Sequence, residues 1–190
     1  AEMSNDVPTT PLTFFKPNTS VIGPDEAIIK PRGTSNLHYE GELAVVIGRI
    51  CKSVPADRVE EVIFGYTIAN DVTDRDLQKA EPQWARGKGW DTFCPLGPWI
   101  VTHLSVSEAS ALEITTTLDG AAVQQGNTRD MVHGIAGLVC FISEFTTLLP
   151  GDVILTGTPA GVGPMDAGQH ISVSIDQIGT LNNRVDAEQA

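Results

Sequence analysis

The clearest strand in this chain of 190 residues reads His38-Tyr39-Glu40-Gly41-Glu42-Leu43-Ala44-Val45-Val46-Ile47-Gly48. Its second half, Leu43–Ile47, is continuously apolar, which predicts burial on both faces of a sheet. Alternate residues of a strand point to the same side, so His38, Glu40 and Glu42 would project together, with the two carboxylates about 7 Å apart. Taken alone, this polar half also fits an exposed strand end. Because it leads directly into a buried strand, however, the two carboxylates would be costly without a cation between them.

A second polar run follows another apolar strand and reads Asn70-Asp71-Val72-Thr73-Asp74-Arg75-Asp76-Leu77-Gln78. It predicts a turn from strand to helix, with Thr73 and Asp76 at the spacing of a capping box. If the helix begins here, one face near its positive end carries a carboxylate, a guanidinium and an amide, from Asp71, Arg75 and Gln78. The purely structural alternative is a capped surface helix with an Asp–Arg pair.

Two glycine-rich segments are weaker signals. Lys88 lies between two glycines, which predicts a cation on a mobile loop that other groups can approach closely. The spacing of a phosphate-binding loop is absent there. Thr158 lies where a predicted strand, Val153–Thr156, opens into a loop rich in glycine and proline.

The rest of the chain predicts a β-rich organisation with few helices. The predicted elements are a short strand at Leu12–Phe15, helical turns at Asp57–Val62, an apolar strand at Ile63–Ala69, a hairpin of Ile114–Leu118 and Ala121–Gln124 around Asp119-Gly120, and a half-exposed strand through Ile171, Val173 and Ile175. One strong helix is predicted over Thr128–Leu148, capped by Thr128, because apolar residues recur there every three or four positions.

Composition limits the classes of function. With 12 Lys and Arg against 24 Asp and Glu, the formal net charge is −12, which argues against nucleic-acid partners and anionic membranes. The apolar stretches are far shorter than a membrane span. Residues 1–11 do not resemble a signal peptide, and the three cysteines (Cys51, Cys94 and Cys140) have no metal-ligand spacing. We therefore expect a single domain over residues 1–190, in the reducing cytoplasm.

Together, Glu40, Glu42 and Asp71 would form a site whose ligands are all oxygen atoms. Carboxylates favour Mg²⁺, Mn²⁺ or Ca²⁺, whereas zinc prefers histidine and cysteine. Three protein ligands leave open positions for water or a bidentate substrate, which is a catalytic arrangement. The histidines outside the first strand show no metal-ligand spacing.

At this point the chain resembles the fumarylacetoacetate hydrolase family, in its short acylpyruvase-like branch. The similar stretches are Phe14-Phe15-Lys16-Pro17, His38–Gly48, Gly65–Gln78, Lys88–Pro95 and Pro150–Gly163. They occur in the family's order and cover nearly the whole chain. The resemblance implies a mainly β fold, a β-roll of mixed sheets with few short helices and one long helix, and a homodimer.

The resemblance also implies roles for individual residues. Glu40, Glu42 and Asp71 would bind Mg²⁺ or Mn²⁺, with Ca²⁺ as a substitute ion. Contacts to the substrate would come from Arg75, Gln78, Lys88 and Thr158, and Lys88 would also take part in catalysis. His38 becomes a neighbour of the site rather than a ligand.

The family's catalytic base is a histidine at the start of an H-x-x-E-M run. Glu2-Met3 matches the end of that run, so Glu2 is expected in the catalytic set and the histidine just before Ala1. We therefore expect that an N-terminal segment belongs to the protein in addition to the residues printed here.

The function implied is chemistry through an enolate on a small dianionic 2-oxo or 2-hydroxy-enoic carboxylate, of the kind met in aromatic catabolism. Hydrolysis of an acylpyruvate, decarboxylation of oxaloacetate and isomerisation of a hydroxymuconate-type diacid such as 2-hydroxyhepta-2,4-diene-1,7-dioate remain open. The alternative from another class is a non-catalytic domain that binds metal and carboxylate and has lost its N-terminal base.

Overall fold

The first predicted strand forms two strands in the structure, a computed structural model that describes residues 9–189. β3 (Leu37–Tyr39) and β4 (Gly41–Ile47) are separated at Glu40. The interruption follows from the Glu40 backbone N–H, which donates to the side chain of Asn70 at 2.9 Å instead of to a strand. All seven residues of β4 are buried, so the predicted burial on both faces is confirmed.

β4 belongs to a five-stranded sheet in the order β1-β7-β5-β4-β10. The other strands are β1 (Val21–Ile22), β5 (Ile63–Asn70), β7 (Cys94–Val101) and β10 (Val153–Leu155). β1 runs parallel to β7, and the remaining pairs are antiparallel.

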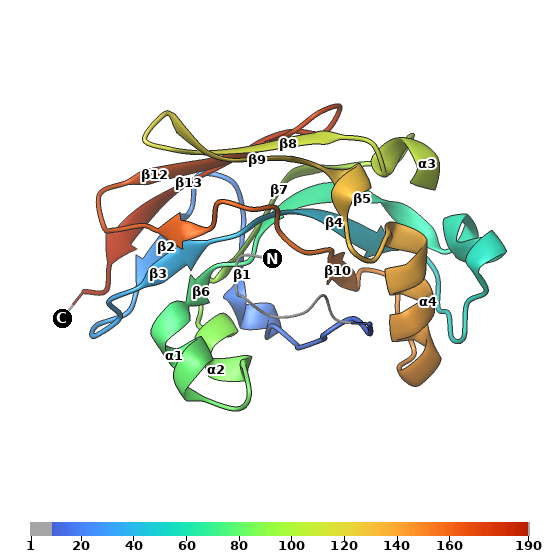
Figure 1. The fold of residues 1–190 in the computed structure, drawn as a ribbon, viewed down its shortest axis with the longest axis horizontal. Coiled ribbons are helices and arrows are strands. Elements are labelled where there is room, and N and C mark those ends of the chain that lie inside the picture. The colour runs from blue at the N-terminus through green and yellow to red at the C-terminus, as the bar shows by residue number, and fades with distance from the viewer. Residues whose placement is uncertain (1–8, 190) are drawn as a thin grey trace.

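A second five-stranded sheet has the order β2-β13-β12-β8-β9 and lies above the first in Figure 1. Its strands are β2 (Ala27–Lys30), β8 (Glu113–Leu118), β9 (Ala121–Asn127), β12 (His170–Ile175) and β13 (Gly179–Ala187). The predicted hairpin joins β8 to β9, and the three predicted apolar residues of β12 are buried, so both predictions are confirmed. β2 pairs with β13 in parallel.

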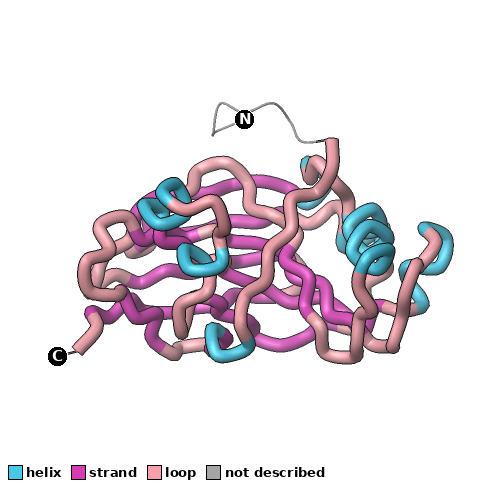
Figure 2. Tube along the Cα trace, turned by 90° about the horizontal axis from the view of Figure 1, so that it is seen from below, coloured by secondary structure: helices cyan, strands magenta, loops and turns pink. Residues whose placement is uncertain are grey.

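A small third sheet, in the order β11-β3-β6, consists of β11 (Gly163–Pro164), β3 and β6 (Thr73–Asp74). The fold is therefore mainly β with mixed sheets, as expected, and Figure 2 shows a few short helical segments (cyan) among many strands (magenta).

The two large sheets approach each other closely at Gly41, the first residue of β4. A Cβ at this position would collide with the Thr116 hydroxyl and lie 2.9 Å from the side chain of Val173, so the approach requires glycine. The larger hydrophobic core contains Leu43, Val45 and Ile47 of β4. It also contains Val173 of β12 and Val139, which lies on a helix.

The α-helices are short: α1 (Arg75–Ala80), α2 (Ala85–Lys88), α3 (Val106–Ala109) and α4 (Ile135–Phe145). The 3₁₀ turns are η1 (Asn18–Ser20), η2 (Ala56–Glu61) and η3 (Thr128–Asp130). η2 matches the helical turns predicted at Asp57–Val62.

The predicted helix over Thr128–Leu148 is too long at both ends. The Thr128 hydroxyl donates to the Ala109 carbonyl and accepts the Leu112 N–H, so this residue closes a turn and Gly134 caps α4 instead. At the other end, the Leu148 backbone pairs with Cys51. Long-range pairing thus overrides a helical pattern at each end.

The strand predicted at Leu12–Phe15 is wrong, because these residues have no regular secondary structure. Instead, side chains attach the segment to the molecule. The Phe14 ring packs edge-on against Trp84 at 5.7 Å between centroids, and Lys16 makes an ion pair with Asp71. Within residues 9–189, no helix is long and apolar enough to cross a membrane, and the three cysteines are free thiols.

Candidate active site

Glu40, Glu42 and Asp71 meet where β4 begins and β5 ends. The two strands are antiparallel with Gly41 opposite Asn70, so residues just before and after these positions become neighbours. The Asp71 N–H donates to the Glu40 carbonyl at 2.8 Å. One carboxylate oxygen from each of the three acids lies within 4.8 Å of the others, and all three residues are buried. The structure therefore brings together the predicted acidic cluster.

Lys88 places a cation inside this cluster. Its ammonium donates to Glu40 Oε2 at 2.7 Å and to Asp71 Oδ2 at 2.6 Å. The Arg75 guanidinium donates to the other oxygen of Glu40, Oε1, at 2.5 Å. Lys88 is 2% exposed and is the last residue of α2, so the predicted mobile loop is wrong. An ammonium is buried this deeply because two carboxylates compensate its charge.

Close packing of two short helices puts Lys88 there. A Cβ at Gly87 would lie only 2.9 Å from the backbone nitrogen of Gln78, so glycine lets α2 approach α1. The Lys88 ammonium also lies 5.1 Å from the centroid of the Phe14 ring, over its face.

The start of α1 differs by one residue from the prediction. Asp74, not Thr73, is the N-cap, and its carboxylate accepts two backbone N–H groups of the first turn. The Thr73 hydroxyl donates to the Asp71 carbonyl at 2.8 Å instead. Asp71 therefore precedes the helix rather than lying on its face, whereas Arg75 begins the helix.

Lys16 is a site residue to which the sequence analysis assigned no role. Its ammonium donates to Asp71 Oδ1 at 2.6 Å, to the Val72 carbonyl at 3.3 Å, and to the Lys88 carbonyl. The two oxygens of Asp71 are thus held by two different lysines. Lys16 lies within a stretch that resembles the family, and that resemblance was the one signal that could have drawn attention to it.

The two uncharged candidate residues, Gln78 and Thr158, have different hydrogen-bond partners. Gln78 is buried and its Oε1 accepts from Arg75 at 2.5 Å. The Thr158 hydroxyl donates to the Gly41 carbonyl at 2.9 Å and accepts from Gln124 at 2.8 Å, so it anchors the start of β4. Gln124, which sequence reasoning missed, also accepts the Gly41 N–H at 3.1 Å.

The electrostatics of the cluster are unbalanced at Glu42. Burial, together with the charges of Asp71 and Glu40, raises the pKa of Glu42 well above its usual value, although the Gly157 N–H donates to it at 2.6 Å. Burial alone would lower the pKa of Lys88, but the Asp71 and Glu40 carboxylates raise it. A buried acid repelled by two like charges is suited to a bound cation, which would remove the repulsion.

His38 lies beside the cluster and does not belong to it. Burial, with the charges of Arg75 and Lys79, lowers the pKa of His38 to about 4, against an opposing effect of Asp76. Its buried Nδ1 has no hydrogen-bond partner among the described residues. The only group of described residues that could hold a metal consists of the three carboxylates, which fits the expectation that His38 is a neighbour.

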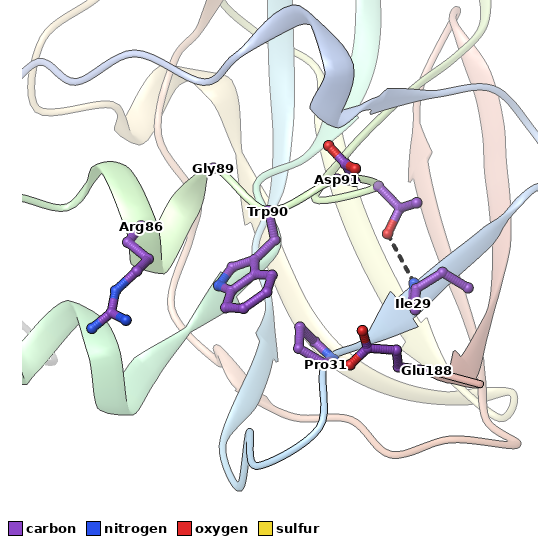
Figure 3. A pocket seen from close by; sticks show the side chains of 8 residues that line it. Ile29, Pro31, Arg86, Gly89, Trp90, Asp91 and Glu188 are labelled. Atoms are coloured by element: carbon purple, nitrogen blue, oxygen red, sulfur yellow. Dashed lines mark hydrogen bonds between the residues drawn. The ribbon is translucent and has the colours of Figure 1, made fainter. Parts of the chain in front are cut away.

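A surface cavity of about 610 Å³ lies next to the loop that follows Lys88 (Figure 3). In that view the Trp90 side chain lies between Arg86 on α2 and Pro31, and the Thr92 hydroxyl accepts the Ile29 N–H at 2.9 Å. No candidate site residue lines this cavity. Glu2, the remaining candidate, falls outside the described residues.

Chemically, three buried carboxylates in this geometry can hold a hard divalent cation. The donor set fits Mg²⁺ or Mn²⁺, because every ligand is oxygen and, among the described residues, no ion pair to Glu42 competes with a bound cation. Lys88, Arg75 and Lys16 surround the cluster with cationic donors that could orient an anion.

Comparison with known proteins places this geometry in context. The family model described as the fumarylacetoacetate (FAA) hydrolase C-terminal matches residues 1–186. Protein Rv2993c of Mycobacterium tuberculosis is 52% identical over 185 residues, covering 97% of this chain and 70% of the relative.

Two solved structures are informative. 5-Carboxymethyl-2-hydroxymuconate delta-isomerase from Mycobacterium smegmatis has a TM-score of 0.93 and 51% identity, over 100% of this chain and 74% of the other. Maleylpyruvate hydrolase from Sphingobium sp. SYK-6, in complex with manganese (II) ion and pyruvate, has a TM-score of 0.85 and 37% identity, over 93% of this chain and 64% of the other.

Proposed function

Because the chain belongs to the fumarylacetoacetate hydrolase family, we propose that it is a divalent-metal-dependent enzyme acting on small 2-oxo or 2-hydroxy-enoic carboxylates. The observation that carries the proposal is the buried cluster of Glu40, Glu42 and Asp71 with oxygens within 4.8 Å of one another. Mn²⁺ or Mg²⁺ is the proposed ion, supported by the manganese complex of the hydrolase relative.

The ion, when bound, would supply a Lewis acid for the carboxylate and adjacent oxo oxygen of the substrate. Glu40, Glu42 and Asp71 would hold it. Lys88 and Arg75 would bind the remaining anionic oxygens and stabilise the enolate charge that develops as a C–C bond breaks or a proton moves. Gln78 and Thr158 would orient the substrate through neutral hydrogen bonds, and Glu2 would belong to the catalytic set.

Charge supports a small dianionic substrate rather than a polymer. The whole chain carries −12, which repels polyanions such as nucleic acids. Locally, three lysine and arginine side chains already balance the three carboxylates, so a divalent ion would leave the site with a surplus of two positive charges. A dianion neutralises that surplus.

The experiment measures Mn²⁺ binding and turnover of three substrates: an acylpyruvate, oxaloacetate and 2-hydroxyhepta-2,4-diene-1,7-dioate. We expect metal-dependent turnover of at least one by the protein that includes any residues encoded upstream of Ala1. Glu40→Ala and Asp71→Ala should abolish both binding and turnover, whereas Glu144→Ala, at an exposed position on α4, should change neither.

Each outcome decides between functions. Turnover that survives Glu40→Ala and Asp71→Ala would rule out the metal-dependent mechanism. Tight Mn²⁺ binding without turnover of any of the three compounds would favour a metal-binding domain without catalysis. Which compound is turned over separates hydrolysis, decarboxylation and isomerisation.

The proposal includes a homodimer in the cytoplasm. The exposed apolar side chains of Phe64 on β5 and of Trp99 and Ile100 on β7 support an interface on this sheet. Light scattering should give twice the 20.3 kDa mass of the chain. A monomer at micromolar concentration would contradict it.

A further inference from the structure

The Lys88 ammonium lies between two of the acids that would hold an added cation. It bridges Glu40 Oε2 and Asp71 Oδ2, which belong to two of the three clustered carboxylates. The other oxygens of the same two acids are held by Arg75, on Glu40 Oε1, and by Lys16, on Asp71 Oδ1. Each of these four oxygens therefore already accepts a hydrogen bond from a cationic side chain.

A divalent ion held by the same acids would repel the cations that already contact them, and the cation with the fewest other contacts is the one expected to move. Besides its ion pair with Asp71, the Lys16 ammonium donates hydrogen bonds to the carbonyls of Val72 and Lys88, which hold it in place. Arg75 is held as well, since it donates to Gln78 and begins α1. Among the described residues, Lys88 Nζ contacts the two carboxylates and the Phe14 ring at 5.1 Å. Its partners would be taken over by the ion.

We propose that Lys88 is an exchangeable counter-ion: its ammonium pairs with Glu40 and Asp71 in the ion-free protein and is released from both when a divalent cation binds. The inference rests on the proposed function, because it concerns the same carboxylates. The released ammonium gains a new role. Having lost both carboxylates of the protein, it becomes available to the carboxylate of an incoming substrate, so that loading of the ion prepares the site for an anion.

A structure of the wild-type protein crystallised with Mn²⁺ tests the exchange directly. We expect the ion among Glu40, Glu42 and Asp71, with Lys88 Nζ beyond about 3.5 Å from Asp71 Oδ2 and Glu40 Oε2, outside hydrogen-bond range. Lys16 Nζ should keep its contact with Asp71 Oδ1. An ion in the cluster with Lys88 still bonded to both carboxylates would overturn the proposal.

Mn²⁺ affinity, measured by calorimetric titration at constant pH, gives an independent result. A unit charge within about 4–6 Å changes the affinity of a carboxylate for a proton by about 10- to 1000-fold. Removing the competing ammonium in Lys88→Met should therefore tighten Mn²⁺ binding about tenfold or more. Lys79→Met removes the same charge from an exposed position on α1 and should change the affinity less than about twofold.

Lys88→Gln keeps an N–H donor for Glu40 and provides the same comparison if Lys88→Met does not fold. Unchanged or weaker Mn²⁺ binding in the folded Lys88 variant would overturn the exchange while leaving the metal centre in place. Absence of Mn²⁺ binding in both the wild type and the variant would instead overturn the proposed metal centre itself.

Discussion

Glu42 is buried between two like-charged neighbours, Glu40 and Asp71, and one of its oxygens accepts the Gly157 N–H at 2.6 Å. At the scale of the residue, the candidate site depends on how the charges of its buried carboxylates are compensated. Lys88, Lys16 and Arg75 compensate Glu40 and Asp71 directly, whereas the contact to Glu42 is a backbone amide. Among the described residues, Glu42 therefore lacks the direct ion pair that Glu40 and Asp71 have.

Replacing Glu42 by glutamine should stabilise the ion-free protein and weaken Mn²⁺ binding about tenfold or more. Because folding raises the pKa of Glu42, the folded chain holds more protons here than the unfolded chain once the pH exceeds the ordinary value of 4.5. The contribution of Glu42 to stability therefore falls as pH rises. The neutral variant lacks this penalty.

Urea unfolding in the presence of a chelator, at about pH 5 and about pH 8, measures the effect. The advantage of Glu42→Gln over the wild type should be larger at the higher pH. Glu144→Gln, at an exposed position, should show no such trend. An advantage that shrinks with rising pH would contradict the assignment.

His38 should limit stability in acid. Its pKa is lowered to about 4 in the folded protein, from an ordinary 6.5, chiefly because it is buried. Between these values the unfolded chain binds the proton and the folded chain does not, so stability falls as the pH drops from about 6.5 to about 4. His38→Gln, which remains neutral, should lose less stability over this window in urea unfolding. His103→Gln, at an exposed position, should behave like the wild type. Parallel losses in the wild type and His38→Gln would rule out this role.

At the scale of the element, contacts from distant segments decide the secondary structure around the site. β3 and β4 are separated where Glu40 bonds to Asn70, and Thr128 bonds to Ala109 in a turn that precedes α4 instead of lying within the helix. The segment of residues 11–17 has no regular structure, yet it brings Phe14 and Lys16 to the site.

Lys16→Met should loosen the segment of residues 11–17 and destabilise the protein. The Lys16–Asp71 pair is almost fully buried, and breaking such a pair costs about 3 kcal/mol or more when one charge is left uncompensated. Because Lys88 still contacts Asp71, we expect a loss of about 2–3 kcal/mol in urea unfolding.

Limited proteolysis should also cleave the Lys16→Met protein faster within residues 9–17. Lys52→Met, at an exposed lysine, serves as the matched control and should leave both stability and cleavage unchanged. Equal cleavage rates for the wild type and Lys16→Met would show that Lys16 does not anchor the segment.

At the scale of the whole molecule, the site depends on how closely the two large sheets approach each other. Gly41 begins β4 and meets Thr116 and Val173 of the second sheet, while its N–H and carbonyl bond to Gln124 and Thr158. Glu40 and Glu42 flank this contact, so the distance between the sheets sets where both carboxylates lie.

Gly41→Ala should destabilise the protein by about 3 kcal/mol, at the upper end of what overpacking costs, and should weaken Mn²⁺ binding. A Cβ here has no space, since the Thr116 hydroxyl and Val173 lie against it. Gly137→Ala is the matched control: this position is inside α4 and nothing lies within 4 Å of an added Cβ. The control should gain about 0.5–1 kcal/mol from helix propensity. Thermal and urea unfolding compare the two, and equal effects would contradict the close approach.

The residue pattern alone predicted that β4 is buried on both faces and that β8 and β9 form a hairpin around Asp119-Gly120. These follow from run length, alternation and turn residues, which act over a few positions along the chain. That Asp71 joins Glu40 and Glu42 was a hypothesis supported by the resemblance to a family, which also pointed to the other charged residues of the site.

Three other features came from tertiary contacts: Lys16 shares Asp71 with Lys88, Lys88 is buried rather than on a mobile loop, and the long predicted helix stops short at both ends. Each of these features depends on contacts between residues that are far apart along the chain. Lys16 and Asp71, for example, are separated by 55 positions. Local pattern carries no information about which distant charge will compensate a buried one, because that pairing is set by the packing of the sheets and helices that bring the two together.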